Sequence, residues 1–379
     1  MRSRHVKQAA MNVLQILPAL ETGGVERTAV EMTEALIAAG HGSHVLSGGG
    51  RLAADIETLG GINHFANIGS KNILSVPWRI AGIRRLIAAH NIDVVHARSR
   101  APAWPAMLAA RTEKTPFVTT YHGIYNAKSS VKRFYNSVMA KGDIVIANSE
   151  FTKAHILKTH NTDAARITVI PRGVDMARFD PAKVSSADVV KLRQAWRAGS
   201  DKTLILLPAR LTGWKGQRVA IAALAALPDH YHLVCLGDAQ GRTEYVAELE
   251  AQIAFHDLGR RVTLAGHSGD MPTAYAASDI VICPSTDPEA FGRTAAEAQA
   301  MGKPVIASAH GGALETVVDG RTGWLVAPAN VPELCEAIKR GGAGLSDVGE
   351  TARARILEKF SKTSLQIATL EVYTRTTRA

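Results

Sequence analysis

The chain has 379 residues, of which 46% are hydrophobic and 21% charged, and its net charge is +10. This composition excludes a disordered chain, and the length exceeds that of a single core, so we expect two domains of similar size. No apolar run reaches the about 18–20 residues that span a bilayer. Because the segment Met11–Pro18 is also too short and too strand-like for a signal peptide, we expect a cytoplasmic protein.

Short β-rich runs alternate with Ala- and Leu-rich helical runs along the chain, which is typical of parallel α/β sheets. Near-continuous apolar runs such as Leu204–Leu207 are typical of strands buried on both faces. In the first half we expect strands at Asn12–Leu17, His44–Leu46, Asn63–Ile68, Val94–Ala97, Phe117–Tyr121, Ile144–Ala147 and Ile167–Ile170, with helices between them at Val25–Ala39, Pro77–His90 and Ala103–Arg111.

The segment from Pro171 to Ser186 separates two series of strands, and its Pro, Gly and Ser residues predict a linker. We therefore predict an α/β protein with two doubly wound Rossmann-like domains, residues 1–172 and 173–355, which face each other across a cleft, a common place for ligands. In the second half we expect strands at Leu204–Pro208, Leu233–Leu236, Val262–Ala265, Ile280–Cys283 and Pro304–Ala307.

Three candidate sites follow strands of the first half. Gly23 and Gly24 precede a helix, where glycine lets the backbone approach a ligand and the helix N-terminus attracts phosphate. A simple turn explains them equally well, because they belong to no GxGxxG or Walker motif. Arg98, after the fourth strand, can meet an anionic group. His122, after the fifth, can donate a hydrogen bond, act as general acid or base, or only shape the turn.

Two cations follow the first strand of the second half. Arg210 and Lys215 lie on one loop with glycines beside them, so they can clamp a diphosphate, although surface charge on a loop is the alternative. The chain contains no Asp-x-Asp, the usual carboxylate cradle for a metal that bridges a nucleotide diphosphate. A departing diphosphate would then be stabilised by protein cations and backbone N–H groups, and we expect no metal cofactor.

Glu289 and Glu297 follow the strand Ile280–Cys283, with seven residues between them. One carboxylate is expected on the loop and the other about two turns into the next helix. A solvated loop and a charged helix face would explain the spacing alone. At the carboxyl end of a parallel strand, however, two separated acceptors suit a ligand with hydroxyls at both ends, such as a sugar nucleotide.

The positive charge is concentrated in the first half. Residues 1–175 hold 21 Lys and Arg against 12 Asp and Glu, whereas residues 176–379 hold 23 against 22. No nucleic-acid-binding motif accompanies this charge and aromatic residues are only 5%, so we expect an anionic membrane surface or a phosphorylated lipid rather than nucleic acid. A basic solvated face is the alternative.

Neither the cysteines nor the histidines show the spacing of a metal site. The fourteen histidines include no HExxH or similar pattern. The three cysteines fit no metal or CxxC pattern and are expected to be free thiols, with Cys235 and Cys283 buried in strands.

Taken together, these motifs resemble the GT-B retaining glycosyltransferases of family 4, over essentially the whole chain. Arg172 departs from the family pattern, in which Asn is common. The matching segments are Gly23–Arg27, Tyr121–Gly123, Ile170–Asp175, Ala209–Gly216, and Glu289 through Glu297.

The resemblance implies roles for these residues in binding the donor sugar nucleotide. Glu289 would contact hydroxyls of the donor sugar and Glu297 the ribose. Arg210 and Lys215 would neutralise the departing diphosphate. They would be aided by the backbone N–H groups around Phe291, Gly292 and Arg293.

It also implies roles in the first domain, which would bind the acceptor. His122 would lie near the reacting sugar and, with Glu289, is a candidate catalytic residue. Gly24 would contact the donor, and Gly23 and Arg98 the acceptor or phosphate side. Residues 356–379 would form a helix that crosses back to the first domain.

The implied activity is retaining transfer of a hexose from a nucleotide-diphosphate sugar to a hydroxyl of a glycan or lipid-linked glycan, in cell-envelope polysaccharide or lipopolysaccharide biosynthesis. The cytoplasmic enzyme would work at the inner face of the cytoplasmic membrane. Two alternatives stay open: a sugar-nucleotide epimerase or hydrolase of the same fold, and a non-catalytic sugar-nucleotide-binding protein. A dehydrogenase is disfavoured by the missing dinucleotide fingerprint.

Overall fold

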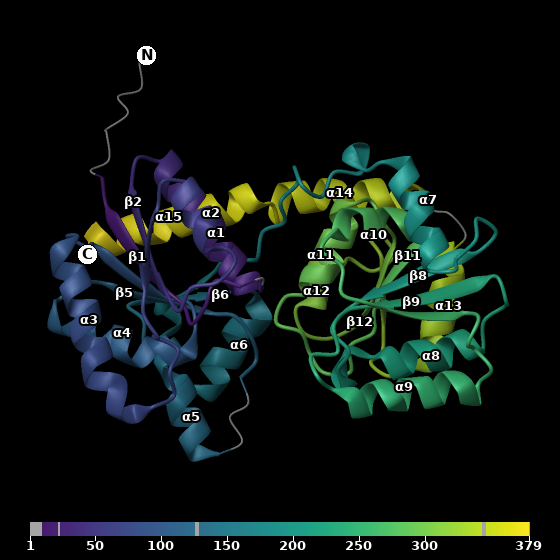
Figure 1. Cartoon of the computed structure of the whole chain (residues 1–379), viewed down its shortest axis with the longest axis horizontal. Coiled ribbons are helices and arrows are strands. Elements are labelled where there is room, and N and C mark those ends of the chain that lie inside the picture. The colour runs from purple at the N-terminus through teal and green to yellow at the C-terminus, as the bar shows by residue number, and fades with distance from the viewer. Residues whose placement is uncertain (1–9, 22, 126–128, 343–345, 379) are drawn as a thin grey trace, which may run out of the picture. The chain divides into compact units, whose positions relative to one another are not determined.

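The computed structural model describes residues 10–21, 23–125, 129–342 and 346–378 (Figure 1). The chain divides into two compact units: unit 1 consists of Met1–Pro171 and Leu365–Ala379, and unit 2 of Arg172–Ser364. The sequence placed this boundary one residue later. None of the helices in the described ranges is both long and apolar enough to cross a membrane.

Unit 1 is built on a parallel sheet. In its described residues seven strands lie in the order β3-β2-β1-β4-β5-β6-β7. The order reverses between β1 and β4, which makes this a doubly wound sheet with its switch point there. The strands are β1 (Asn12–Ile16), β2 (Gly42–Ser47), β3 (Ile62–Phe65), β4 (Val94–Ala97), β5 (Phe117–Tyr121), β6 (Ile144–Ala147) and β7 (Ile167–Val169).

Helices connect these strands and cover the sheet (Figure 1). Leu14 and Ile16 of β1 pack into one core cluster and Val13 into another, so both faces of the strand are buried, as its apolar run predicts. The helices of unit 1 are α1 (Gly24–Ala38), α2 (Ala53–Thr58), η1 (Ile73–Ser75), α3 (Val76–Ala89), α4 (Arg100–Thr112), α5 (Ser130–Ser137), η2 (Val138–Ala140), α6 (Glu150–Thr159), η3 (Ala164–Arg166) and α15 (Lys362–Arg378).

The last helix, α15, completes the core of unit 1. Leu365, Val372 and Tyr373 belong to the same cluster as Val13 of β1, and Gln366 donates to the backbone carbonyl of Glu31 over 2.7 Å. The helix begins later than the expected segment 356–379, because residues up to Lys359 belong to α14.

Unit 2 repeats this topology. In its described residues six parallel strands lie in the order β10-β9-β8-β11-β12-β13, with the switch point between β8 and β11. The prediction of two doubly wound Rossmann-like domains is thus confirmed. The strands are β8 (Thr203–Pro208), β9 (Tyr231–Leu236), β10 (Val262–Gly266), β11 (Ile280–Cys283), β12 (Val305–Ser308) and β13 (Trp324–Val326).

Strand β8 shows why unit 2 folds in layers. Ile205 and Leu207 pack into one core cluster and Leu204 and Leu206 into another, so alternate side chains fill the two faces of the sheet. The helices of unit 2 are η4 (Pro181–Lys183), α7 (Ser186–Ala195), η5 (Gly213–Lys215), α8 (Gln217–Ala225), α9 (Thr243–Phe255), α10 (Met271–Ala277), α11 (Arg293–Ala300), α12 (Ala313–Thr316), α13 (Val331–Gly342) and α14 (Ser346–Lys359).

The expected linker is more ordered than its composition predicts. Val174 N–H donates to the carbonyl of Phe360 over 2.7 Å, and Lys362 N–H donates back to Val174 over 2.8 Å. A Cβ on Gly173 would lie 2.6 Å from the Cα of Lys362. Glycine at 173 therefore lets this segment pair with the chain that leads into α15.

Candidate functional site

The loops after β8 and β11 meet at the switch point of unit 2, where open parallel sheets bind ligands. Gly216 ends the first loop with a φ of +81°, and a Cβ there would lie 1.9 Å from the carbonyl oxygen of Pro284 in the second. Thr286 N–H also donates to the carbonyl of Trp214 over 2.8 Å. The close approach of the two loops therefore depends on a glycine at 216.

Lys215 and Glu289 form an ion pair across these loops. Nζ of Lys215 lies 2.9 Å from Oε1 of Glu289, and the two side chains are only 13% and 20% exposed. Ser285 Oγ donates to the same carboxylate oxygen over 2.6 Å, and Lys215 Nζ lies 4.3 Å from the centre of the Trp214 ring. From the sequence, Lys215 was expected to contact a diphosphate and Glu289 a sugar. The structure places the two side chains in contact with each other.

The carboxylate of Glu297, on α11, is held by two other side chains. Arg293, one turn earlier, donates from Nε to Oε1 over 2.8 Å, and Tyr275 donates from its hydroxyl to Oε2 over 3.1 Å. Burial and the charge of Glu297 raise the pKa of Tyr275, so its hydroxyl keeps its proton and stays a donor. Glu297 is therefore fixed in orientation at the same end of the sheet as Glu289.

Phe291 and Gly292 lead into α11. Phe291 is 3% exposed and its ring packs against that of Phe360, so its backbone rather than its ring is available to a ligand. Gly292 caps the helix with a φ of +85°, a conformation that favours glycine. The first N–H groups of a helix have no partner within it and can receive an anionic or hydroxyl ligand.

The sequence did not predict a role for a third loop, which follows β12. Gly312 N–H donates to the carbonyl of Glu289 over 2.8 Å, and a Cβ on Gly312 would lie 2.4 Å from the Cα of Phe291. His310 Nε2 lies 2.9 Å from the carbonyl oxygen of Ser285. This loop fixes the backbone around Glu289. Its signal in the sequence is a pair of glycines shortly after a predicted strand.

A small pocket opens between the second and third loops. Ser308 Oγ in its wall is buried and has no hydrogen-bond partner among the described residues, so it can bind a polar group of a ligand. The pocket is lined by Cys283, Ser285, Glu289, Gly292, Ala295, Ala307, Ser308, His310 and Ala313.

Arg210 lies on the same loop as Lys215 but has different partners. It is exposed, and its Nη1 donates over 3.2 Å to Oε1 of Gln240 in the loop after β9. Gln217 fixes the backbone of Arg210 by donating to its carbonyl over 3.0 Å.

In unit 1, Gly23, Gly24 and His122 follow strands at the carboxyl edge of the sheet. Gly23 caps α1 and Gly24 is its first residue, so the N–H groups of a 15-residue helix begin at this pair. His122 is half-buried, and Asn148 holds its backbone by donating to its carbonyl over 3.2 Å.

Arg98 requires a correction. It was expected to meet the acceptor, but it is 2% exposed. Its Nε donates to Oε1 of Gln15 over 2.8 Å and its Nη2 to the hydroxyl of Tyr373 over 3.4 Å. Arg98 lies in a buried polar network that joins β1 to α15. Its guanidinium therefore binds side chains of the protein interior and not the predicted ligand.

Comparison with known proteins identifies the family. Residues 22–178 match the family Glycosyltransferase Family 4 and residues 188–341 match Glycosyl transferases group 1. The D-inositol 3-phosphate glycosyltransferase of Xylanimonas cellulosilytica is 32% identical over 308 residues, which are 76% of this chain and 72% of that protein. Curated relatives of this name align over 58% to 72% of their own length.

Comparison with solved structures points to the same family. The glycosyltransferase of Rickettsia africae ESF-5 has 35% sequence identity and a TM-score of 0.90, with 97% of this chain and 99% of that one covered. Anabaena Alr3699/HepE in complex with UDP-glucose has 26% identity and a TM-score of 0.84, with 96% and 100% covered. On this evidence, the chain is a glycosyltransferase and belongs to the GT-B glycosyltransferases of family 4.

Proposed function

We propose that this enzyme transfers a hexose from a nucleotide-diphosphate sugar to a hydroxyl of a glycan or lipid-linked glycan, with retention of the anomeric configuration. The observation that carries the proposal is the shielded Lys215–Glu289 ion pair at the switch point of unit 2. A solved relative, Alr3699/HepE, binds UDP-glucose, which supports a sugar nucleotide as the donor.

The ion pair suggests how the donor binds. A diphosphate brings negative charge to Lys215, which can exchange its carboxylate partner for a phosphate oxygen. Glu289 is then released to accept hydrogen bonds from hydroxyls of the sugar. Glu297, held by Arg293 and Tyr275, is proposed to accept from the ribose.

The chemistry then rests on the leaving group. The bond between the anomeric carbon and the diphosphate oxygen breaks while the acceptor oxygen bonds to the same face of that carbon. The proton of the acceptor hydroxyl passes to the departing diphosphate oxygen. Lys215, Arg210 and the first N–H groups of α11 are proposed to stabilise the negative charge that develops. Because the chain lacks Asp-x-Asp, we expect transfer to proceed without added Mg²⁺ or Mn²⁺.

The acceptor is proposed to be presented by an anionic membrane surface during cell-envelope polysaccharide or lipopolysaccharide synthesis. Ile73, Leu74 and Trp78 of unit 1 are 73% to 80% exposed, and the exposed cations Lys71 and Arg85 lie close to them in the chain. Apolar side chains among cations are the combination that binds anionic bilayers from one side.

A phosphorylated polyol is the second candidate acceptor, because a relative with 32% identity is named a D-inositol 3-phosphate glycosyltransferase. The basic first half of the chain suits either acceptor.

The test begins with thermal unfolding in the presence of UDP-, GDP- and ADP-hexoses, because a ligand that binds the folded protein raises its stability, and the rise grows with the logarithm of ligand concentration over Kd. The stabilising donor is then incubated alone, with inositol 3-phosphate, or with a lipid-linked glycan in anionic vesicles. A glycosylated product confirms transfer and identifies the acceptor. Rapid turnover of the donor alone would instead indicate an epimerase or hydrolase.

A further inference from the structure

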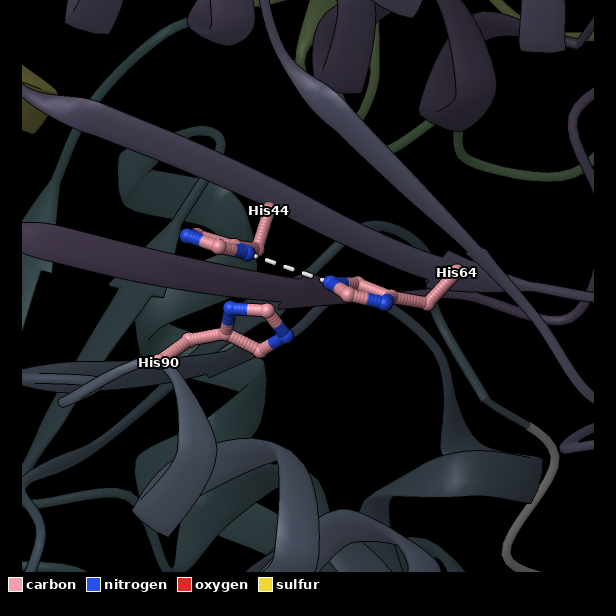
Figure 2. Close-up of side chains that lie close together, drawn as sticks. All are labelled: His44, His64 and His90. Carbon is pink, nitrogen blue, oxygen red and sulfur yellow. Dashed lines mark hydrogen bonds between the residues drawn. The ribbon is translucent and has the colours of Figure 1, made fainter.

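Three histidines from separate elements of unit 1 lie together (Figure 2), and none of them is among the residues assigned to sugar transfer. His44 is the third residue of β2 and His64 the third of β3. In the ladder His44 lies opposite Ile62 and His64 opposite Leu46. Since side chains two residues apart along a strand point to the same face, the two imidazoles share one face of the sheet.

His90 joins them from the end of α3. It follows the last residue of that helix, its N–H donates to Leu86 over 3.1 Å, and its carbonyl accepts from Nδ2 of Asn12 over 3.0 Å. The backbone of each histidine is thus fixed by regular structure or by a specific bond. Side chains on such supports are well placed to form a site.

The distances suit a small cation. One ring nitrogen from each histidine lies within 4.8 Å of the others, and Nδ1 of His44 lies 3.1 Å from Nε2 of His64. Around tetrahedral Zn²⁺, with Zn–N distances near 2.0–2.1 Å, ligand nitrogens are roughly 3.3 Å apart. The His44–His64 pair is already close to this spacing, and a ring nitrogen of His90 lies within 4.8 Å of theirs.

Packing between the imidazole rings explains the positions of the three histidines less completely than a shared cation does. The ring centre of His90 lies 4.7 Å from the ring centre of His44 and 5.0 Å from that of His64, and both pairs of rings are tilted. The rings of His44 and His64 are stacked. A single N–H···N bond can satisfy the His44–His64 pair, but it gives His90 no partner in the cluster. A cation would be shared by all three lone pairs.

We propose that His44, His64 and His90 bind one divalent transition-metal ion of the Zn²⁺ type, with water as the fourth ligand. His64 and His90 are half-exposed, which gives the ion and the water a path to the site. The ion would join β2 and the edge strand β3 to the end of α3. Its role is to stabilise unit 1, and it takes no part in the transfer chemistry assigned to unit 2.

The test uses the full-length, tag-free protein after removal of metal by a chelator. Titration with Zn²⁺ in a calorimeter is expected to show saturable binding of one ion per chain and a rise in the thermal midpoint. His90→Gln, at a half-exposed helix end, should weaken the affinity at least about tenfold, which corresponds to 1.4 kcal/mol. The matched control is His256→Gln, which removes an exposed imidazole from unit 2 and should leave Zn²⁺ binding unchanged.

Co²⁺ supplies a second measurement that does not depend on a variant. On the unmodified protein it should give the intense visible absorption of four-coordinate cobalt, and Zn²⁺ should abolish that absorption. The absence of saturable Zn²⁺ binding, unchanged affinity in a folded His90→Gln variant, or a six-coordinate Co²⁺ spectrum would each overturn the proposal.

Discussion

The ion pair between Lys215 and Glu289 makes these two side chains depend on each other before any substrate arrives. Each shields the charge of the other at a partly buried position, so the loss of one leaves the other without compensation. A single substitution is therefore expected to change the interactions of the remaining partner as well. A double-mutant cycle on the pair should show coupling for both binding and transfer.

Lys215→Ala should weaken binding of the nucleotide diphosphate by roughly 10–100-fold, because it removes a charge-assisted bond worth about 1.5–3 kcal/mol. Calorimetry with the donor nucleotide measures this. Lys202→Ala is the matched control, since Lys202 precedes β8 whereas Lys215 follows it. Equal affinity in wild type and Lys215→Ala would exclude Lys215 from the diphosphate site.

Glu289→Ala should reduce the transfer rate by roughly 10²–10³-fold, on the scale seen when one preorganised polar contact is removed from an active site. Binding of the nucleotide itself should be retained, because the cation at 215 is released from its partner. Steady-state rates and calorimetry separate the two effects, and Glu248→Ala, at an exposed ion pair, is the control. Full activity of Glu289→Ala would contradict its proposed role.

His96 should make the protein less stable in acid. It is fully buried between the hydroxyls of Tyr373 and Thr120, each 2.7 Å from a ring nitrogen, and burial, with Arg98 and His122 nearby, lowers its pKa well below 6.5. Above pH 6.5, neutral His96 makes its full contribution to the free energy of unfolding. Below that pH the unfolded chain takes up a proton that the folded protein does not, so stability falls by up to about 1.4 kcal/mol per pH unit.

Denaturant unfolding between pH 5 and 7.5 measures this effect. His96→Gln keeps a polar side chain without the titration, so its free energy of unfolding should fall less steeply between pH 6.5 and 5. Identical slopes in the two proteins would show that His96 does not contribute.

At the scale of elements, the site depends on glycines that let loops approach one another. Gly216→Ala introduces a Cβ against the carbonyl oxygen of Pro284 at a φ of +81°, and the left-handed conformation alone costs about 1–3 kcal/mol. We expect a lower thermal midpoint and weaker donor binding.

Gly213→Ala, in the same loop, is the matched control. It meets nothing within 4 Å and has no positive φ, so it should leave stability and binding nearly unchanged. If Gly213→Ala and Gly216→Ala lose similar amounts of stability and donor binding, the contact with Pro284 and the positive φ of Gly216 are not the cause.

Strands that are buried on both faces of a sheet were predicted most accurately from the sequence. Apolar runs predicted Val94–Ala97, Phe117–Tyr121 and Ile280–Cys283 to the residue, because strands buried on both faces give a continuous signal. Strand β13 was missed.

The position of a side chain was harder to predict than the element that carries it. Arg98 follows a strand as a ligand-binding residue would, yet its partners Gln15 and Tyr373 come from distant parts of the chain. The same limit applies to His44, His64 and His90, whose separation in sequence matches no known ligand spacing. Only tertiary packing brings such residues together.

At the scale of the whole molecule, unit 1 needs both ends of the chain. Tyr373 is fully buried in its core, accepts a hydrogen bond from Arg98 and shares one with His96. A chain that ends at residue 364 should therefore expose the core of unit 1, with rapid proteolysis there, while unit 2 still binds the nucleotide. Limited proteolysis with mass spectrometry locates the cuts. Protection of unit 1 equal to that in the full chain would show that α15 is dispensable.

The return of α15 to unit 1 also sets an order for folding during synthesis. Residues 172–364 separate the two parts of unit 1 in the chain, and at about 5–20 residues per second a ribosome needs roughly 10–40 s to make them. During that interval the first 171 residues have left or are leaving the ribosome without the helix that covers part of their core. Unit 2, which is continuous in the chain, can fold before unit 1 is complete, so the nascent first unit is the part of this enzyme most in need of a chaperone.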